Sequence, residues 1–151
     1  MSLESDIAVL RQVPLFADLT ADQLRLLAFG AEHRRLKSGE TLFRVAARAD
    51  EGFVIVSGEI TLKAGPPGAE VPVAGFGPGA LLGELALITE TRRAATAFAD
   101  GTCDLIRIPR TLFRRMLEEY PDLALVLHER IADQLARMMH DITALEHRFT
   151  D

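Results

Sequence analysis

The feature that most constrains the fold is a change of periodicity along the chain. Between about residues 33 and 108, short apolar or alternating runs are separated by turn signals rich in Gly and Pro. The expected strands are residues 41–44, 52–57, 59–63, 71–75, 95–99 and 104–108. The expected turns are residues 38–40, 57–59, 65–68, 75–79 and 100–101. Short strands at this spacing favour an antiparallel barrel or sandwich.

Helical patterns flank this region. A capping box between Thr20 and Gln23 predicts a helix from about residue 21, preceded by a Pro14–Phe16 connector and a short amphipathic turn at 7–10. After Pro109 an apolar helical face extends to Tyr120. Pro121 suits the first turn of a last helix, which is expected to end near Glu146.

Length and composition narrow the function classes. A chain of 151 residues with 48% hydrophobic and 26% charged residues is typical of one globular domain. The net charge of -5 argues against a nucleic-acid binder. The single cysteine, Cys103, excludes an internal disulfide framework and a cysteine-built zinc site, and we expect it to be a packed core thiol. No signal peptide, lipidation motif or membrane-spanning run is evident, so a cytoplasmic protein is expected.

The chemistry concentrates in residues 75–99, GFGPGALLGELALITETRRAATAFA. A Gly-rich turn leads into a short helix expected at 83–88, whose first amides suit an anion. Glu84 can accept hydrogen bonds from sugar hydroxyls. Arg93 can bind two phosphate oxygens through its planar fork, and the small side chains after it let a ligand approach the backbone. This combination fits a sugar phosphate of low charge.

The segment GELALITETRRAAT resembles the phosphate-binding cassette of the cyclic nucleotide-binding domain family. In that family the Glu of the Gly-Glu-Leu-Ala run holds the ribose 2'-hydroxyl and the Arg before the small residues holds the cyclic phosphate. The resemblance covers roughly residues 13–120. It implies these ligand-binding residues: Leu82, Gly83, Glu84, Leu85, Ala86, Arg93, Ala94 and Ala95.

The resemblance also implies a fold class and a ligand. The expected fold is α+β and mainly β, an antiparallel, jelly-roll-like β-roll with N-terminal helices, a short helix inside the cassette and a long C-terminal helix. The expected division of this single domain is helices at about 1–32, the roll at 33–108 and helices at 109–151. Ala94 stands where a Thr or Ser favours guanine in the family, so cyclic AMP is expected to bind better than cyclic GMP.

Some residues depart from the family pattern. Residues 44–48 replace the family's Glu-Gly-Asp-like turn, so the family pattern does not predict the geometry of that loop. Arg92 occupies a position that is often proline, and we interpret it as solvated surface. The chain ends at Asp151, so no appended helix-turn-helix for DNA binding is expected.

The last helix has an apolar stripe with a heptad pattern. Its members are Ile131, Leu135, Met138, Ile142, Leu145 and Phe149. We interpret the stripe as a homodimer seam, as in the bacterial regulators that the chain resembles. Packing of the helix on its own β-roll is the alternative.

The remaining polar residues give little support to an enzyme or a metal site. The four histidines are scattered, and His140 with His147 lacks a third ligand type at metal-binding spacing. The basic group Arg107, Arg110, Arg114 and Arg115 is interpreted as a solvated helix face. We therefore expect a non-enzymatic cyclic nucleotide sensor that changes its helix arrangement and signals to an unidentified protein. The alternatives are a protein-interaction module without nucleotide binding and a small-molecule β-roll enzyme.

Overall fold

The structure is a computed structural model that describes the backbone of residues 2–150 and the side chains of residues 2–133, 136 and 137. It divides into two compact units, Met1–Met116 and Leu117–Asp151, which are described separately below. The first unit contains the N-terminal helices, the sheets and most of helix α3. The second contains the long helix α4.

The N-terminal region consists of α1 (Leu3–Arg11), the 3-10 helix η1 (Pro14–Phe16) and α2 (Ala21–Gly30). The predicted capping box at α2 is confirmed: the Gln23 amide donates to Thr20 Oγ1 at 3.2 Å, and the Thr20 amide donates to Gln23 Oε1 at 2.9 Å. Helix α1 is longer than the expected turn at 7–10. A second capping box, formed by Ser2 and Ser5, begins this helix. The sequence analysis missed this box because a capping box usually has Glu or Gln in its last position.

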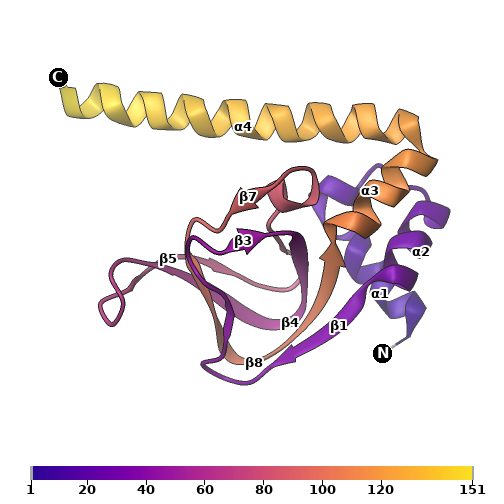
Figure 1. The fold of residues 1–151 in the computed structure, drawn as a ribbon, viewed down its shortest axis with the longest axis horizontal. Helices are drawn as coiled ribbons and strands as arrows, with labels where there is room; N and C mark the ends of the chain where they lie inside the picture. Colours follow the sequence, from indigo (N-terminus) through magenta and orange to yellow (C-terminus); the bar gives the residue numbers. More distant parts are fainter. Residues whose placement is uncertain (1, 151) are drawn as a thin grey trace. The chain divides into compact units, whose positions relative to one another are not determined.

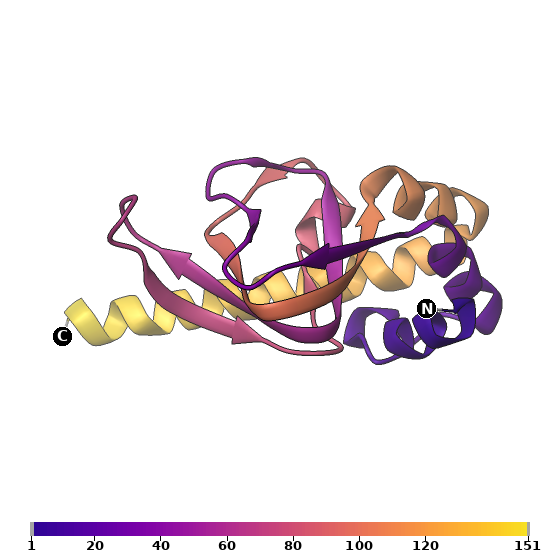
Figure 2. The same ribbon diagram turned by 90° about the horizontal axis from the view of Figure 1, so that it is seen from below.

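The first unit is built on an antiparallel sheet that curls into a roll (Figures 1 and 2). The strand order is β1-β8-β4-β5, with β2 also paired to β8 and β6 to β4. These strands are β1 (Glu32–Leu36), β2 (Thr41–Phe43), β4 (Glu51–Ala64), β5 (Val71–Phe76), β6 (Leu81–Leu82) and β8 (Thr96–Pro109). A separate two-stranded sheet pairs β3 (Arg48–Ala49) with β7 (Thr91–Arg92). The predicted fold class, a mainly β fold with an antiparallel β-roll between helices, is confirmed.

Two of the predicted turns lie inside long strands, so the predicted breaks at 57–59 and 100–101 are wrong. Strand β4 continues through Gly58 and β8 continues through Gly101. The pairing register between the two strands shifts around Ser57, where Ile55 pairs with Leu105 and Glu59 pairs with Asp100. The glycines therefore form a bulge that bends both strands together and leaves them continuous.

Strand β1 was missed because its sequence, EHRRL, is almost entirely polar. Only Leu36 in this strand is buried, and the other residues are exposed or half-buried. The strand exists because its backbone pairs with β8 from Glu32↔Arg107 to Leu36↔Cys103. Tertiary pairing therefore overrides the weak local preference.

The core of the roll is formed by buried side chains from the curled sheet, including Leu82 of β6. Phe53, Ile55, Ile60 and Leu105 have no exposed surface. Cys103 is also fully buried, and its thiol lies 3.1 Å from the Glu59 carbonyl oxygen, so its prediction as a packed core thiol is confirmed.

Helices from both ends of the first unit meet beside the roll (Figures 1 and 2). Helix α3 (Arg110–Glu119) follows β8 directly. Its Phe113 ring lies 6.2 Å from the ring of Phe16 in η1. A Cβ added to Gly30 of α2 would lie 2.5 Å from Leu112. The first and last segments of this unit therefore share one packed end.

Helix α4 (Pro121–Thr150) begins at the predicted proline and extends a few residues beyond the predicted end. Of the predicted heptad stripe, only the side chain of Ile131 is described. The side chains of Leu135, Met138, Ile142, Leu145 and Phe149, and those of His140 and His147, lie outside the described residues. Within the part of the chain that the structure describes, no helix is long and apolar enough to cross a bilayer.

Candidate functional site

The predicted site is built on the connection from β6 to β7. Gly83 follows β6 with a φ of 89°, in the left-handed region that favours glycine. The 3-10 helix η2 (Leu85–Leu87) then forms the short helix that the sequence predicts at 83–88. The amides of Ala86 and Leu87 donate to Gly83 O and Glu84 O, each at 3.1 Å. The turn therefore uses the amides of Ala86 and Leu87 itself.

Arg93 lies just after β7 and is buried, with only 7% of its surface exposed. Its Nη2 donates to the Glu51 carbonyl oxygen at 2.9 Å. Its Nη1 lies beneath Gly83, where an added Cβ would be 2.6 Å away. Its Nε is buried and has no hydrogen-bond partner among the described residues. The fold thus brings Gly83 and the guanidinium of Arg93, ten residues apart in the chain, into direct contact.

The charge of Arg93 has no partner carboxylate among the described side chains, although acidic residues lie near it. Glu51 instead pairs with Arg107, whose Nε and Nη2 lie 3.0 and 2.8 Å from Glu51 Oε2. Burial lowers the pKa of Arg93, and the negative charges of Glu51 and Asp50 oppose that shift. A buried guanidinium in this state is costly unless an anion approaches it. Chemically, the arrangement is therefore suited to bind one negative charge.

The unusual loop at residues 44–48 holds the backbone of Arg93 in place. The Arg93 amide donates to Ala47 O at 2.9 Å, and the Ala46 amide donates to Arg93 O at 2.8 Å. Ala46 adopts a φ of 68°, which is rare for a residue with a side chain. Arg92 is exposed, as predicted, and its Nη1 also donates to Ala46 O at 2.9 Å. The loop therefore replaces the family's usual turn while still bonding to the cassette.

The other predicted site residues differ in accessibility. Leu82, Ala86 and Ala95 are buried, with 5%, 0% and 8% of their surface exposed. Leu82 is part of the roll's core. Glu84 and Leu85 are half-buried, and Ala94 is exposed. The side chains of the three buried residues are therefore not accessible to a ligand. Their backbone groups and their packing against neighbouring residues can still influence the site.

The predicted basic face does not act as one unit. Arg107 forms salt bridges with Glu51, at 2.8 Å, and with Glu32, at 3.0 Å. Arg110 donates through Nε to Ala86 O at 2.8 Å and through Nη2 to Ala49 O at 2.6 Å. Only Arg114 and Arg115 are exposed. The interpretation of all four as a solvated helix face is therefore wrong for Arg107 and Arg110, because strand pairing and the start of α3 direct them to other partners.

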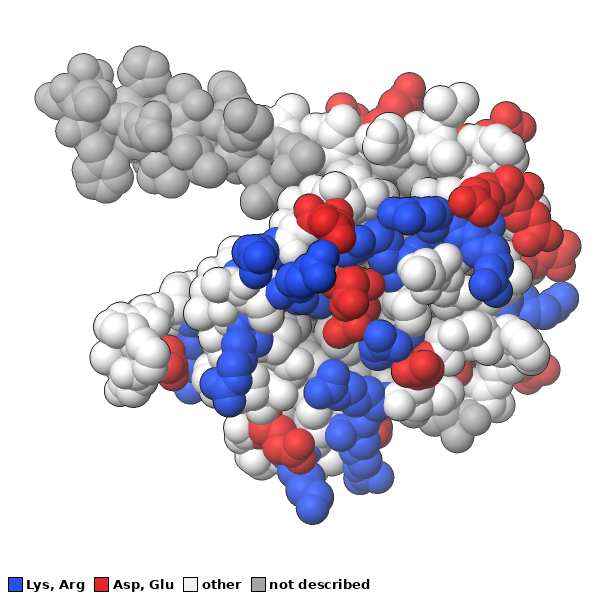
Figure 3. Space-filling model, viewed as in Figure 1, with Lys and Arg blue, Asp and Glu red and all other residues white. Residues whose placement is uncertain are grey.

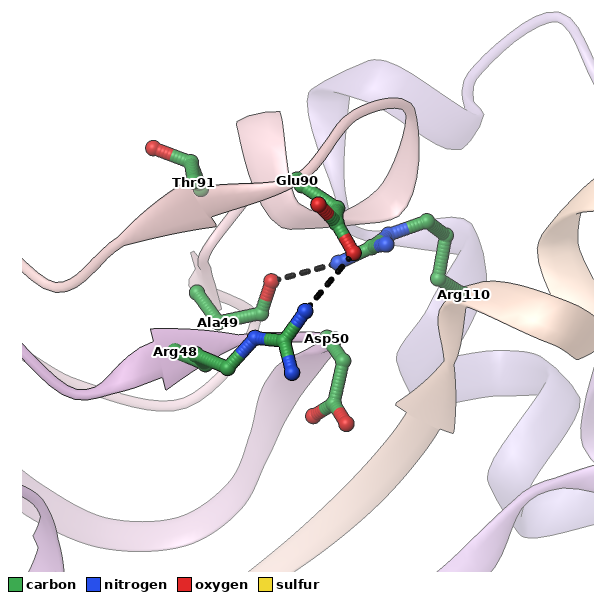
Figure 4. A pocket seen from close by; sticks show the side chains of 6 residues that line it. All are labelled: Arg48, Ala49, Asp50, Glu90, Thr91 and Arg110. Atoms are coloured by element: carbon green, nitrogen blue, oxygen red, sulfur yellow. Dashed lines mark hydrogen bonds and ion pairs between the residues drawn. The ribbon is translucent and has the colours of Figure 1, made fainter.

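Lys and Arg side chains gather in a band over β3, β7 and α3, with acidic side chains between them (Figure 3). A cavity of about 300 Å³ is lined by side chains of the same elements and of the η2–β7 connection (Figure 4). Its lining residues are Arg48, Ala49, Asp50, Glu90, Thr91 and Arg110. Arg48 pairs with Glu90 at 3.0 Å, and Arg110 bonds to Ala49 O across the cavity wall. The cavity contains none of the predicted site residues, and its arginines already have partners within the protein.

Two aromatic residues of the site were missed by the sequence analysis. The Cζ of Arg93 lies 4.2 Å from the centroid of the Phe43 ring and 5.8 Å from that of Phe53. Both rings belong to strands 40 or more residues before Arg93. No local motif could have linked them to the cassette, because only strand pairing brings them together. No group of three or more metal-ligating side chains occurs among the described residues.

Comparison with known families decides the identity of the fold. The family model of the cyclic nucleotide-binding domain matches residues 33–120. The chain belongs to this family. The match spans β1 to the end of α3 and so includes the cassette and Arg93. Solved structures agree: a cyclic nucleotide-binding-like protein from Brucella abortus is 49% identical, with a TM-score of 0.69, over 75% of this chain and 97% of that one.

Two further structures are similar to this cyclic nucleotide-binding domain. The N-terminal domain of a transcriptional regulator from Streptomyces coelicolor is 31% identical, with a TM-score of 0.78, over 86% of this chain and 94% of that one. The regulatory domain of Toxoplasma gondii PKA, crystallised with cAMP, is 29% identical, with a TM-score of 0.70, over 76% of this chain and 44% of that one.

Curated relatives place a similar domain inside much longer proteins. Lysophospholipase NTE1 of Pyricularia oryzae is 26% identical over 136 residues, which are 89% of this chain and 9% of that protein. Lysophospholipase nte1 of Neurospora crassa is 27% identical, with the same coverage. The chain therefore spans about a tenth of the length of these relatives.

Proposed function

We propose that this domain is a sensor that binds a cyclic nucleotide, with cyclic AMP as the preferred ligand. The observation that carries the proposal is the buried guanidinium of Arg93, which has an unpartnered Nε and no carboxylate partner among the described residues. A cyclic nucleotide has one negative phosphate charge, so it would neutralise this one cation. A multiply charged ligand would leave excess negative charge beside Glu51 and Asp50.

The residues of the cassette have distinct roles in this proposal. Arg93 binds the cyclic phosphate, and cassette amides complete the anion's hydrogen bonds. Glu84 accepts a hydrogen bond from the ribose 2'-hydroxyl. Gly83 lets the backbone approach Arg93, since any side chain there would collide with the guanidinium. Leu82, Leu85, Ala86 and Ala95 shape the surface around the sugar phosphate.

The preference for adenine rests on Ala94. Its methyl side chain is exposed and offers no hydroxyl to a guanine base. One missing hydrogen bond changes affinity by roughly 0.5–1.5 kcal/mol, so cyclic GMP is expected to bind about two- to tenfold more weakly than cyclic AMP.

Binding would act by shifting a population of conformations, since a ligand favours the state that it binds better. In this proposal the cassette responds to the ligand, and the helices after Pro109 change position and signal to another protein.

The domain itself performs no chemistry. The similarity to lysophospholipases covers too little of those proteins to assign their activity to this chain. A role as an interaction module without nucleotide binding is the alternative.

Calorimetric titration with cyclic AMP, cyclic GMP and cyclic di-GMP tests the proposal. Wild type should bind cyclic AMP most tightly. Arg93→Ala should lose at least about 3 kcal/mol, or roughly a hundredfold in affinity, because a two-pronged charged contact disappears. Arg93→Lys should restore little, since an ammonium cannot reproduce the planar fork. Glu84→Ala should have a smaller effect than Arg93→Ala.

Arg92→Ala is the matched control, because it removes the neighbouring arginine from an exposed position. It should bind cyclic AMP nearly as well as wild type. Equal losses from Arg92→Ala and Arg93→Ala would contradict the site assignment. A wild type that binds none of the three nucleotides would favour the interaction module.

A further inference from the structure

The structure assigns a positioning role to Phe43: we propose that its ring is a platform that holds the Arg93 guanidinium in the orientation in which it receives the anion. The phosphate-binding part of this inference rests on the proposed function. The geometric part does not, because it concerns two side chains of the protein itself.

The contact between the two side chains is close. The Cζ of Arg93 lies 4.2 Å from the centroid of the Phe43 ring, well within the 6 Å range of a cation–π interaction. A guanidinium is weakly hydrated and stacks on aromatic faces. Burial also removes most competing water, which strengthens the attraction between the cation and the ring's negative face.

The ring itself is held by the fold. Phe53, which has no exposed surface, packs beside it with ring centroids 6.3 Å apart and planes 26° from parallel. In the sheet, Phe43 of β2 pairs with Ala97 of β8, four residues after Arg93. The Val45 amide donates to Thr96 Oγ1 at 3.0 Å and fixes the chain just after the ring. The Phe43 ring is therefore anchored to the start of β8, which begins three residues after Arg93.

Hydrogen bonds alone leave the guanidinium underdetermined. The bond from Nη2 to Glu51 O fixes one corner, and Nε has no partner among the described residues. Rotation about that single corner would tilt the fork away from Gly83 and the cassette. The close contact with the face of the Phe43 ring opposes this rotation, so the ring supplies the orientation that the polar contacts do not.

The test uses a matched pair of variants. Phe43→Leu removes the platform. Phe98→Leu is the control, because Phe98 is also half-buried and lies 5.0 Å from a different cation, Lys63. Phe43→Tyr keeps an aromatic face. Pentafluorophenylalanine at position 43 keeps the ring in place but reverses its quadrupole, so it removes the attraction even if Phe43→Leu folds poorly.

The first measurement needs no ligand. Solution NMR should show the Arg93 δ protons shifted upfield by the ring current in wild type, Phe43→Tyr and Phe98→Leu, and Phe43→Leu should reduce the shift to the part that the more distant Phe53 ring contributes. With pentafluorophenylalanine the Arg93 side chain should show faster rotation about its guanidinium bonds. An Arg93 signal that is the same in Phe43→Leu as in wild type would overturn the platform.

The second measurement is calorimetry with cyclic AMP. Phe43→Leu and the pentafluorophenylalanine protein should bind about five- to tenfold more weakly than wild type, while Phe43→Tyr and Phe98→Leu stay within about twofold. The positioning role would be overturned if Phe43→Leu bound as tightly as wild type, or if Phe43→Tyr bound as weakly as Phe43→Leu. A wild type that binds no cyclic nucleotide but shows the Arg93 ring-current shift would refute the proposed function and support the platform.

Discussion

At the scale of single residues, the site depends on a buried charge that the protein only partly compensates. Arg93 has one carbonyl oxygen as a hydrogen-bond acceptor, the aromatic rings of Phe43 and Phe53 beside it, and the negative charges of Glu51 and Asp50 nearby. Full compensation by a close carboxylate would stabilise the protein but would compete with a phosphate. The pairing of Glu51 with Arg107 prevents that competition, because it directs the Glu51 carboxylate elsewhere.

Gly83→Ala should damage both stability and binding. An alanine at φ 89° pays about 1–2 kcal/mol of backbone strain, and its Cβ would lie 2.6 Å from Arg93 Nη1 and 3.1 Å from Glu51 O. The control is Gly101→Ala, at φ 87°, where nothing lies within 4 Å of an added Cβ. Urea unfolding should show a larger loss for Gly83→Ala than for Gly101→Ala, and only Gly83→Ala should weaken cyclic AMP binding. Identical effects would mean that Arg93 does not lie beneath Gly83.

Cys103 predicts a pH dependence of stability. Burial raises the pKa of its thiol in the folded protein. The unfolded thiol ionises near pH 8.5, so above that pH unfolding releases a proton and becomes more favourable. The free energy of unfolding should therefore fall as pH rises from 8 to 10. Urea titrations should show a smaller fall for Cys103→Ala than for wild type, whereas parallel curves would refute this origin.

At the scale of elements, one arginine joins three segments around the cassette. Arg110 is the first residue of α3, and its side chain bonds to η2 through Ala86 O and to β3 through Ala49 O (Figure 4 shows the second bond). Its amide also donates to Asp50 O at 2.9 Å. The short elements β3 and η2 lack the length to be stable alone, so these bonds help to fix them.

Arg110→Met should therefore lower the free energy of unfolding by about 1–3 kcal/mol, because two carbonyl oxygens lose a charged donor. Arg114→Met removes an exposed arginine from the same helix and should change stability by no more than about 0.5 kcal/mol. Thermal and urea unfolding measure both. If the two variants are equally stable, the bonds of Arg110 contribute nothing to the fold.

At the scale of the whole molecule, the roll and the last helix form separate compact units. The apolar stripe of α4 stays a predicted dimer seam, and Leu135 is one of its members. Leu135→Asp would bury a charge in a helix–helix interface and should dissociate the dimer. Ala136→Asp, at an exposed neighbouring position, should leave it intact. Light scattering decides, and a wild type that is monomeric at high micromolar concentration would contradict the seam.

The sequence alone determined the features that depend on local chemistry. The capping box of Thr20 and Gln23, the proline at the start of α4 and the order of residues from Gly83 to Ala95 are local patterns, and each is sufficient to predict an element or a candidate site. The alternating runs between residues 33 and 108 likewise indicated an antiparallel β fold, because strand periodicity is a local property.

Tertiary structure decided what depends on contacts between distant residues. Strand β1 exists only through its pairing with β8, and Gly58 and Gly101 form a bulge instead of two turns because β4 and β8 bend together. The pairing of β2 with β8 brings Phe43 to Arg93, which lies 50 residues later in the chain. No local pattern contains such contacts, since their free energy comes from surfaces that meet only after the sheet has curled.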